Sequence, residues 1–315
     1  MSLKFKKKQV VHEGVYSVYQ SILCTEIKNQ LLDKGIISRF SENVQESKLD
    51  NITEIDLSRD LKNDPSASVG VKYLKNLKKL NLSYNNLDNL DFISSLENIE
   101  ELDLSHNSIE NIDAVINNKK TAVLDKIKKI DLSDNAISTI TKFQNLHGIQ
   151  SLNLSNNMIT DISPISAAYD LESLDLSNNK ITSFRDSMSG LESLKELGLG
   201  YCDISFADIR SLRFINKLVS LDISGTDPDL TLVSGLTNLK KLVLQNCKLD
   251  EKNLDPLNEL RDIEVLDISQ NDIDLESYNN GLDSSKLTKL EELSIGGNMF
   301  TEIPSFSNFE NLKKL

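Results

Sequence analysis

Leucine and isoleucine recur along the chain in one fixed order. From about residue 50 onward the pattern L-x-x-L-x-L-x-x-N-x-I occurs eleven times, with some substitutions, and residues 312–315 begin a twelfth copy. Successive copies are about 24 residues apart, and several are only 22 apart. A period of this length indicates a repeat protein in which each unit packs on its neighbours.

The L-x-L segment of each copy alternates apolar and polar residues with period two. Such alternation predicts a short strand whose leucines point inward. Strands from successive units then lie side by side in one parallel sheet. The remaining residues of a unit leave room only for extended, 3₁₀ or very short helical returns. We expect longer helices from Ala114 to Lys126, from Ser205 to Leu218 and from Asn253 to Leu260.

A polar residue closes each copy of the pattern. Because an asparagine side chain can pair with backbone groups that leave a strand, stacked asparagines predict a ladder that satisfies otherwise buried amides. Asn fills this slot in most units, and Asp60 fills the first one. Cys202, Thr226 and Cys247 replace it in three later units, and we interpret both cysteines as structural.

Residues 1–48 lack the pattern. Apolar residues between Val15 and Leu31 fall on one side of a helix, and Gly35 suits its C-terminal cap. We therefore expect two parts: a basic arm and helical cap in residues 1–48, and the repeat array in residues 49–315. A helix that covers the exposed core of the first unit is one interpretation. A partner-binding or localisation helix is the alternative.

The repeat resembles the leucine-rich repeat family over about residues 50–315. Its 22-residue units are similar to those of the phosphatase-regulatory subclass and of bacterial internalins. The segment Ile159–Ile165 matches the internalin form I-x-D-I-x-P-L, once. The resemblance implies an α/β solenoid with a curved parallel sheet on its concave face, short 3₁₀, helical or extended returns on its convex face, and a role in binding proteins.

Net charge and cysteine content narrow the partners and the compartment. A formal charge of −13 argues against nucleic acid and anionic membranes, and favours a protein partner with a basic segment. No apolar run is long enough to insert into a membrane. Three cysteines without close spacing, and no apolar stretch after the basic start, favour a cytoplasmic protein. A bacterial effector translocated into a host cell is the alternative. The oligomeric state stays open.

Features of an enzyme are scarce. The three histidines, His12, His106 and His147, lie in different parts of the chain, and neither a nucleophile motif nor a phosphate-binding loop occurs. The spacing of cysteine and histidine does not fit a zinc site. We therefore expect no catalytic residues, no metal and no cofactor.

The repeat does predict a binding surface. The residue between the two leucines of L-x-L points to the concave side, and these residues form a first row. The residues three positions later in each unit form a later row. Predicted partner-binding residues in the first of these rows are Asp56, Asn81, Asp103, Asp131, Asn153, Asp175, Asp222, Val243 and Asp267. Those in the later row are Arg59, Tyr84, His106 and Tyr201.

Serines between these two rows suggest an acidic, hydroxyl-lined trough for a basic segment. The alternative is that Asp and Ser are simply common at these positions in the family and have no specific binding role. The pattern changes near Tyr201 and Val243, where Gly198, Gly200 and Gly225 replace polar residues. This change indicates either a specialised binding region or drift between repeat subtypes.

These observations favour a non-enzymatic interaction module that binds a protein through the concave face. Two alternatives stay open at this point. The chain could be a regulatory or targeting subunit of an enzyme such as a phosphatase. It could also be the recognition half of a longer bacterial effector with a missing C-terminal domain.

Overall fold

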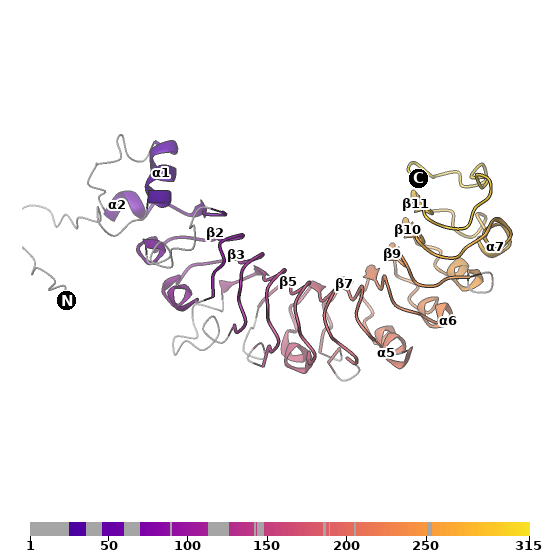
Figure 1. Cartoon of the computed structure of the whole chain (residues 1–315), viewed down its shortest axis with the longest axis horizontal. Coiled ribbons are helices and arrows are strands. Elements are labelled where there is room, and N and C mark those ends of the chain that lie inside the picture. The colour runs from indigo at the N-terminus through magenta and orange to yellow at the C-terminus, as the bar shows by residue number, and fades with distance from the viewer. Residues whose placement is uncertain are drawn as a thin grey trace, which may run out of the picture.

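The computed structural model shows an arc-shaped solenoid with the N-terminal helices at one end and the C-terminus at the other (Figure 1). It describes residues 25–35, 46–59, 70–88, 90–112, 126–141, 143, 148–184, 187–188, 190–204, 206–250 and 254–315.

Eleven parallel strands form a single sheet, in which the order of the strands is their order in the sequence. Each strand has three residues, and the central leucine or isoleucine of one strand pairs with that of the next, as in Ile55 with Leu80. The strands are β1 Glu54–Asp56, β2 Lys79–Asn81, β3 Glu101–Asp103, β4 Lys129–Asp131, β5 Ser151–Asn153, β6 Ser173–Asp175, β7 Glu196–Gly198, β8 Ser220–Asp222, β9 Lys241–Val243, β10 Val265–Asp267 and β11 Glu292–Ser294. The predicted curved parallel sheet is confirmed.

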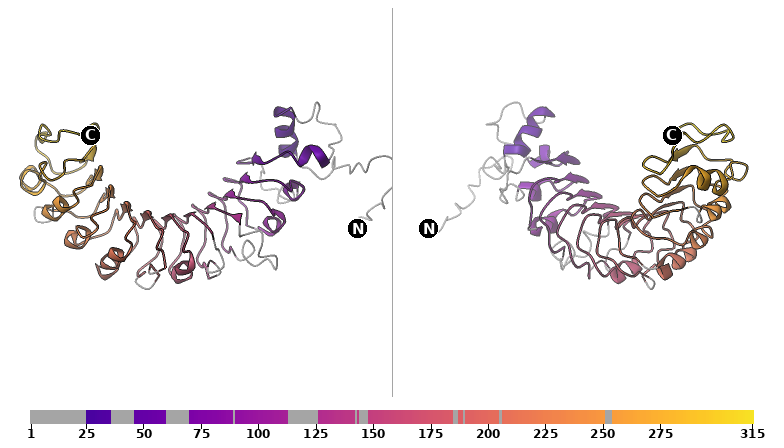
Figure 2. Two further views of the ribbon diagram at one scale, coloured as in Figure 1. Left: turned by 180° about the vertical axis from the view of Figure 1, so that it is seen from behind. Right: turned by 45° about the vertical axis from the view of Figure 1, so that its right-hand side comes forward.

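The strands line the inner side of the arc, and short helical segments lie on its outer side (Figures 1 and 2). A short strand spaces the units more closely than the bulkier returns do, which curves the stack toward the sheet. These outer segments are η1 Gly70–Tyr73, η2 Asp91–Ser95, η5 Ser163–Ala167, α5 Phe206–Ser211, η6 Leu212–Phe214, α6 Leu230–Val233, η7 Asp255–Glu259 and α7 Leu275–Gly281. Helices α1 Thr25–Asp33 and α2 Glu46–Leu49 lie at the N-terminal end of the arc.

Two of the three predicted longer helices can be compared with the structure. A helix does follow residue 205, where α5 continues into η6, and a 3₁₀ helix η7 forms at Asp255–Glu259. The third prediction, Ala114 to Lys126, falls almost wholly outside the described residues. Short helices α6 and α7, which the pattern did not predict, are capped by Asp229 and Asp274. Those aspartates accept the backbone N–H groups that a helix leaves unpaired at its start.

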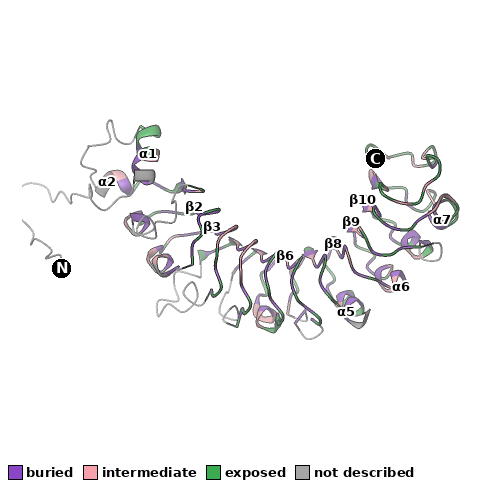
Figure 3. Cartoon of the chain, in the orientation of Figure 1, coloured by how far each residue is buried: buried purple, intermediate pink, exposed green. Residues whose placement is uncertain are grey.

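One continuous hydrophobic core runs the length of the arc. It lies between the sheet and the returns, where buried residues gather in every unit (Figure 3). Both apolar residues of the L-x-L segment are buried in the first ten units, as in Leu152 and Leu154, whereas the residue between them is not. In the last unit Leu293 is buried and Ile295 is partly buried. The predicted inward and outward register of the strands is therefore confirmed.

The asparagine ladder is present, and it joins each unit to the one before it. The side-chain amide of Asn157 donates to the carbonyl oxygens of Leu154 and Ser155 in its own unit and of Leu132 in the preceding unit, at 3.0–3.1 Å. Its Oδ1 accepts the N–H of Ile137, 3.0 Å away in the preceding unit. Asn179 and Asn271 make equivalent bonds. Asp60, the predicted first member, lies outside the described residues.

Substituted ladder positions keep part of this bonding. The Sγ atoms of Cys202 and Cys247 lie 3.3 Å from carbonyl oxygens of the preceding units, those of Leu176 and Ile223 respectively. The Thr226 hydroxyl donates within its own unit, to Ile223 O at 2.6 Å. Both cysteines are buried and unpaired, which agrees with a structural role for them.

Helix α1 covers the outer edge of the first strand. Ile27 and Leu31 are buried in the continuous core. The Gln30 side chain accepts the N–H of Asp56, and Lys34 donates to the Glu54 carbonyl. The described part of the N-terminal segment thus acts as a cap, whereas Val15 and the basic arm lie outside the described residues. The division of the chain at residues 48 and 49 stays a prediction.

A twelfth unit begins at the other end. Lys314 forms an isolated parallel bridge with Glu292, and its carbonyl accepts the N–H of Leu293. Nearby side chains are exposed despite being apolar, including Ile303, which is 87% exposed.

Replacing Asn157 with alanine tests the ladder. The change leaves Ile137 N–H and three carbonyls without their side-chain partner inside the core. We expect the free energy of unfolding, measured in urea, to fall by about 1–3 kcal/mol or more, because unsatisfied buried polar groups cost that much. The neighbouring Asn156→Gly variant is the control, since glycine tolerates its positive φ and Asn156 is exposed. An equal loss in both variants would contradict the ladder's role.

Candidate protein-binding surface

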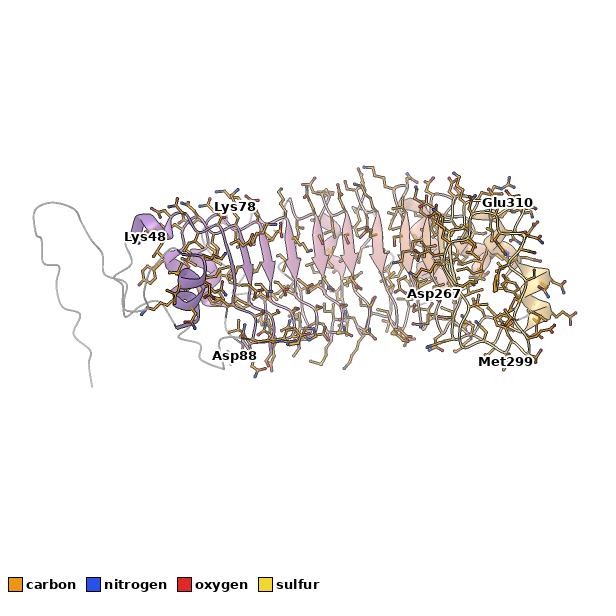
Figure 4. All side chains as sticks on the ribbon, turned by 90° about the horizontal axis from the view of Figure 1, so that it is seen from above. Lys48, Lys78, Asp88, Asp267, Met299 and Glu310 are labelled. Atoms are coloured by element: carbon orange, nitrogen blue, oxygen red, sulfur yellow. The ribbon has the colours of Figure 1, made fainter. Side chains whose placement is uncertain are left out.

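Two residues of every strand project from the concave face, on either side of the buried central residue. In β2, for example, Lys79 and Asn81 flank buried Leu80. Seen from above, the strands lie side by side, with Lys78 at the edge where they begin and Asp88 at the opposite edge (Figure 4). We call the residues after the central leucine the aspartate row, because six of the eleven are aspartate. Those before it form the leading row.

We did not predict the leading row from the sequence as part of the surface, although it follows from the same alternation of apolar and polar residues. It comprises Glu54, Lys79, Glu101, Lys129, Ser151, Ser173, Glu196, Ser220, Lys241, Val265 and Glu292. Lys79 Nζ and Glu101 Oε1 are 2.6 Å apart in adjacent strands, and this hydrogen bond raises the lysine pKa. The signal was the polar residue before the first leucine of L-x-L, which points outward just as the one after it does.

Further ion pairs join neighbouring units along the edge where the strands begin. Their Nζ–O distances are 2.7–2.8 Å and their side chains are half exposed, so each adds little stability. These pairs are Lys78 with Glu100, Lys195 with Glu172, and Lys240 with Glu264. Because the lysines here are largely paired, the unbalanced charge of the concave surface comes from the aspartate row.

Eight of the eleven aspartate row side chains, those that are aspartate or asparagine, accept a hydrogen bond from the serine two residues after them. Asp103 Oδ1 accepts both the N–H and the hydroxyl of Ser105, at 2.9 and 2.7 Å. Asn81 and Asn153 accept from Ser83 and Ser155 in the same way. Six of these eight serines are buried, so the expected hydroxyl lining of the trough is wrong. They instead hold one oxygen of each carboxylate in place.

The next residue in each unit has a left-handed backbone, and we call these residues the turn row. They are Arg59, Tyr84, His106, Asp134, Asn156, Asn178, Tyr201, Gly225, Asn246, Gln270 and Gly297, with φ between 52° and 72°. Glycine, asparagine and aspartate adopt this conformation with little strain, and they fill six of the positions. Histidine is also tolerated there, whereas Arg59, Tyr84, Tyr201 and Gln270 do not have that advantage.

Three bulky side chains of the turn row stack on one another in consecutive units. The Arg59 guanidinium lies over the Tyr84 ring, 4.4 Å from its centroid. The Tyr84 and His106 rings are parallel to within 14°, with centroids 4.0 Å apart. His106 Nε2 lies 3.5 Å from Asp134 Oδ2 in the fourth unit. We call this row of four side chains the aromatic stack, and it is solvent-accessible, since Tyr84 is 44% exposed.

A hollow of about 310 Å³ lies on the concave face of the same four units. Its charged lining belongs to β1, β3 and β4 with Lys79 from β2. The lining side chains comprise Glu54, Asp56, Lys79, Asn81, Glu101, Asp103, Lys129 and Asp131. With five carboxylates against two lysines, the hollow has an acidic balance.

The glycines near Tyr201 have a packing explanation. A Cβ on Gly198 would lie 2.4 Å from Asp175 Oδ1, and one on Gly225 would lie 2.4 Å from the Tyr201 ring. The absent side chains therefore make room for the carboxylate and the ring of the preceding unit. Tyr201 itself is 45% exposed. That this region is specialised for binding stays a prediction.

The predicted site residues all lie on this surface or along its rim. Asp56, Arg59, Tyr84 and Tyr201 are exposed, and the other nine are partly exposed. The structure brings Arg59, Tyr84 and His106 into direct contact, and it gathers Asp56, Asn81, Asp103 and Asp131 around one hollow. The remaining residues are spread over β5 to β10.

Within the described residues, no group of three His, Cys, Asp or Glu side chains is arranged to hold a metal ion. None of the helices described is long and apolar enough to cross a membrane.

Family models match most of the array. Models described as "Leucine Rich repeats (2 copies)" match residues 75–117 and 125–167, and "Leucine rich repeat" matches residues 159–204. "Zer-1-like, Leucine-rich repeats" matches residues 209–314. The chain belongs to the leucine-rich repeat family. No curated protein sequence matches it.

Solved structures of bacterial leucine-rich repeat proteins share this fold. An internalin (inlF) from Listeria monocytogenes superposes with a TM-score of 0.66 at 20% identity, covering 95% of this chain and 97% of that one. An internalin C2 from the same species gives 0.63 at 25% identity, covering 75% and 100%. A leucine-rich repeat protein of Leptospira interrogans gives 0.59 at 23% identity, covering 86% and 79%. The internalin-like resemblance is thereby confirmed.

Thiol titration tests the structural role of the ladder cysteines. Burial raises the pKa of the Cys202 thiol and raises that of Cys247 to about 11, so both stay protonated at pH 7.5. In a Cys24→Ser background, we expect almost no reaction with Ellman's reagent in the native state. Two thiols should react after unfolding in guanidinium. Rapid native labelling of either cysteine would contradict the interpretation.

Proposed function

We propose that this leucine-rich repeat protein is a non-enzymatic interaction module that binds a protein partner through its concave face. One observation carries the proposal: no described segment of the chain covers the sheet, so the leading and aspartate rows of all eleven strands are available together. Leucine-rich repeat proteins generally act as protein–protein interaction modules.

Charge indicates the kind of partner. Glutamate fills four and aspartate six of the outward positions in the two rows, whereas lysine fills three. Carboxylates about 5 Å apart, at strand spacing, repel one another unless counter-charges lie between them. A partner that supplies lysine or arginine would relieve this repulsion, which supports a basic protein segment rather than nucleic acid.

The cysteines and two N-glycosylation sequons, Asn81–Ser83 and Asn153–Ser155, support a cytoplasmic location as part of the proposal. Cys202 and Cys247 are unpaired. Asn81 and Asn153 project from the concave face, where each accepts hydrogen bonds from the serine two residues on. A glycan on either side chain would disrupt that anchoring and obstruct the surface.

Affinity purification from cells that express the protein, followed by mass spectrometry, tests the proposal. The Ser151→Lys and Ser220→Lys variants add positive charge to the leading row, which already accommodates Lys79, Lys129 and Lys241. We expect the principal partner to be recovered at a level reduced by roughly ten-fold, because a positive charge introduced at the interface repels a basic partner. Tyr201→Asn examines the predicted specialised region in parallel.

Asp170→Lys is the matched control, because Asp170 is an exposed acid on the return side of the unit that follows β5. It should leave recovery unchanged. Loss of the partner in the control alone, or unchanged recovery in all three concave-face variants, would contradict the proposal. The identity of the partner also separates the alternatives, since an enzyme such as a phosphatase would indicate a regulatory subunit.

A further inference from the structure

We infer that the aromatic stack and the acidic hollow beside it form one recognition site, which takes an extended basic segment of a partner protein with an aromatic residue next to an arginine or lysine. This inference rests on the proposed function and locates its main contact in the first four units, β1 to β4. Three observations support it.

The aromatic stack retains bulky residues where the backbone disfavours them. A left-handed conformation is unfavourable for a residue with an ordinary side chain, because its Cβ approaches the following carbonyl oxygen. Asn156 and Asn178, in the fifth and sixth units, show that asparagine suits the same slot. Strained residues of this kind cluster where they have a binding role. Tyrosine and arginine are also the side chains most enriched among binding hot spots.

Stacking holds these side chains in one orientation. Arg59 and His106 contact Tyr84 from its two neighbouring units, and Asp134 faces His106 from the next one. A surface that is already ordered loses less side-chain entropy when a partner binds. The exposed rim of the Tyr84 and His106 rings offers edge contacts to a further aromatic ring.

The adjoining hollow supplies charge complementarity. Glu101 and Lys79 neutralise each other as an ion pair. Among the hollow's other lining side chains, four carboxylates remain against one lysine, Lys129. These carboxylates belong to Glu54, Asp56, Asp103 and Asp131. The serine bonds fix Oδ1 of each aspartate, which leaves these side chains preorganised for a cation. An arginine or lysine of the partner fits this balance, whereas an acidic side chain is repelled.

The spacing of the two features fits an extended peptide. The turn row lies three residues beyond the aspartate row in each unit, so the two rows are at most about 10 Å apart. Successive side chains of an extended segment point to opposite sides. A segment that crosses the strands can therefore direct a basic side chain into the hollow and the neighbouring aromatic side chain toward the stack.

Fluorescence anisotropy with the full chain and labelled synthetic octapeptides tests the inference. The probe peptide alternates arginine with tyrosine, and the comparison peptides replace either all arginines with glutamate or all tyrosines with serine. We expect measurable binding of the first peptide alone, weakened by added salt because the charges are exposed. Equal binding of all three peptides, or of none, would overturn the inference.

Variants locate the contact without disturbing the fold. Tyr84→Asn removes the central ring but suits the left-handed backbone, and Asp103→Asn removes a charge but keeps the serine bonds that Asn81 and Asn153 already make. Each should weaken binding roughly ten-fold, as hot-spot substitutions do, with an unchanged thermal midpoint. Gln270→Asn places asparagine in the equivalent turn-row slot beside β10, and Asp170→Asn removes a charge on the return side. Both should bind like the unaltered chain.

The same variants separate this inference from the proposed function. If the purified partner is lost from Ser220→Lys but retained by Tyr84→Asn and Asp103→Asn, the concave face binds it elsewhere and only the inference fails. If neither set affects the partner, both fail. Equal weakening of octapeptide binding by the Gln270→Asn and Asp170→Asn controls would indicate nonspecific charge attraction and would also overturn the inference.

Discussion

The asparagine ladder is the constraint on which the rest of the structure depends. A strand of three residues leaves its flanking backbone groups unpaired at the point where the chain turns into the core. The ladder asparagines pair those groups, both within their own unit and with the preceding one. Because burial of unpaired amides is costly, the turn keeps nearly the same form in every unit. Leucine burial alone would not impose this uniformity.

That uniform turn has a consequence for the surface. It forces one residue per unit into a left-handed conformation and fixes the aspartate three residues earlier through the serine bond. The concave face is therefore an ordered array of side chains at strand spacing, and evolution can alter one position without moving its neighbours. Arg59, Tyr84 and His106 become a contact surface because identical turns bring them into register.

Much of this fold could be predicted from the sequence, because burial and the ladder both require specific residue types. The period, the inward leucines and the outward Asp56 and Asp175 followed directly. The serines were misplaced, since alternation ends where the strand ends and the chain turns inward there. The aromatic stack could not be predicted as a unit. Its successive members are 22 to 28 residues apart, and only the turn geometry shows that their side chains face one another.

Oxidative footprinting of the protein, free and with its purified partner, is the most direct test of the concave-face account. Exposed aromatic side chains report on both sides of the solenoid: Tyr84 and Tyr201 on the turn row, and Tyr169 and Phe214 on the return side. We predict that the partner slows oxidation of Tyr84 and Tyr201 and leaves Tyr169 and Phe214 unchanged. Protection of Tyr169 and Phe214, with Tyr84 and Tyr201 unaffected, would contradict the account.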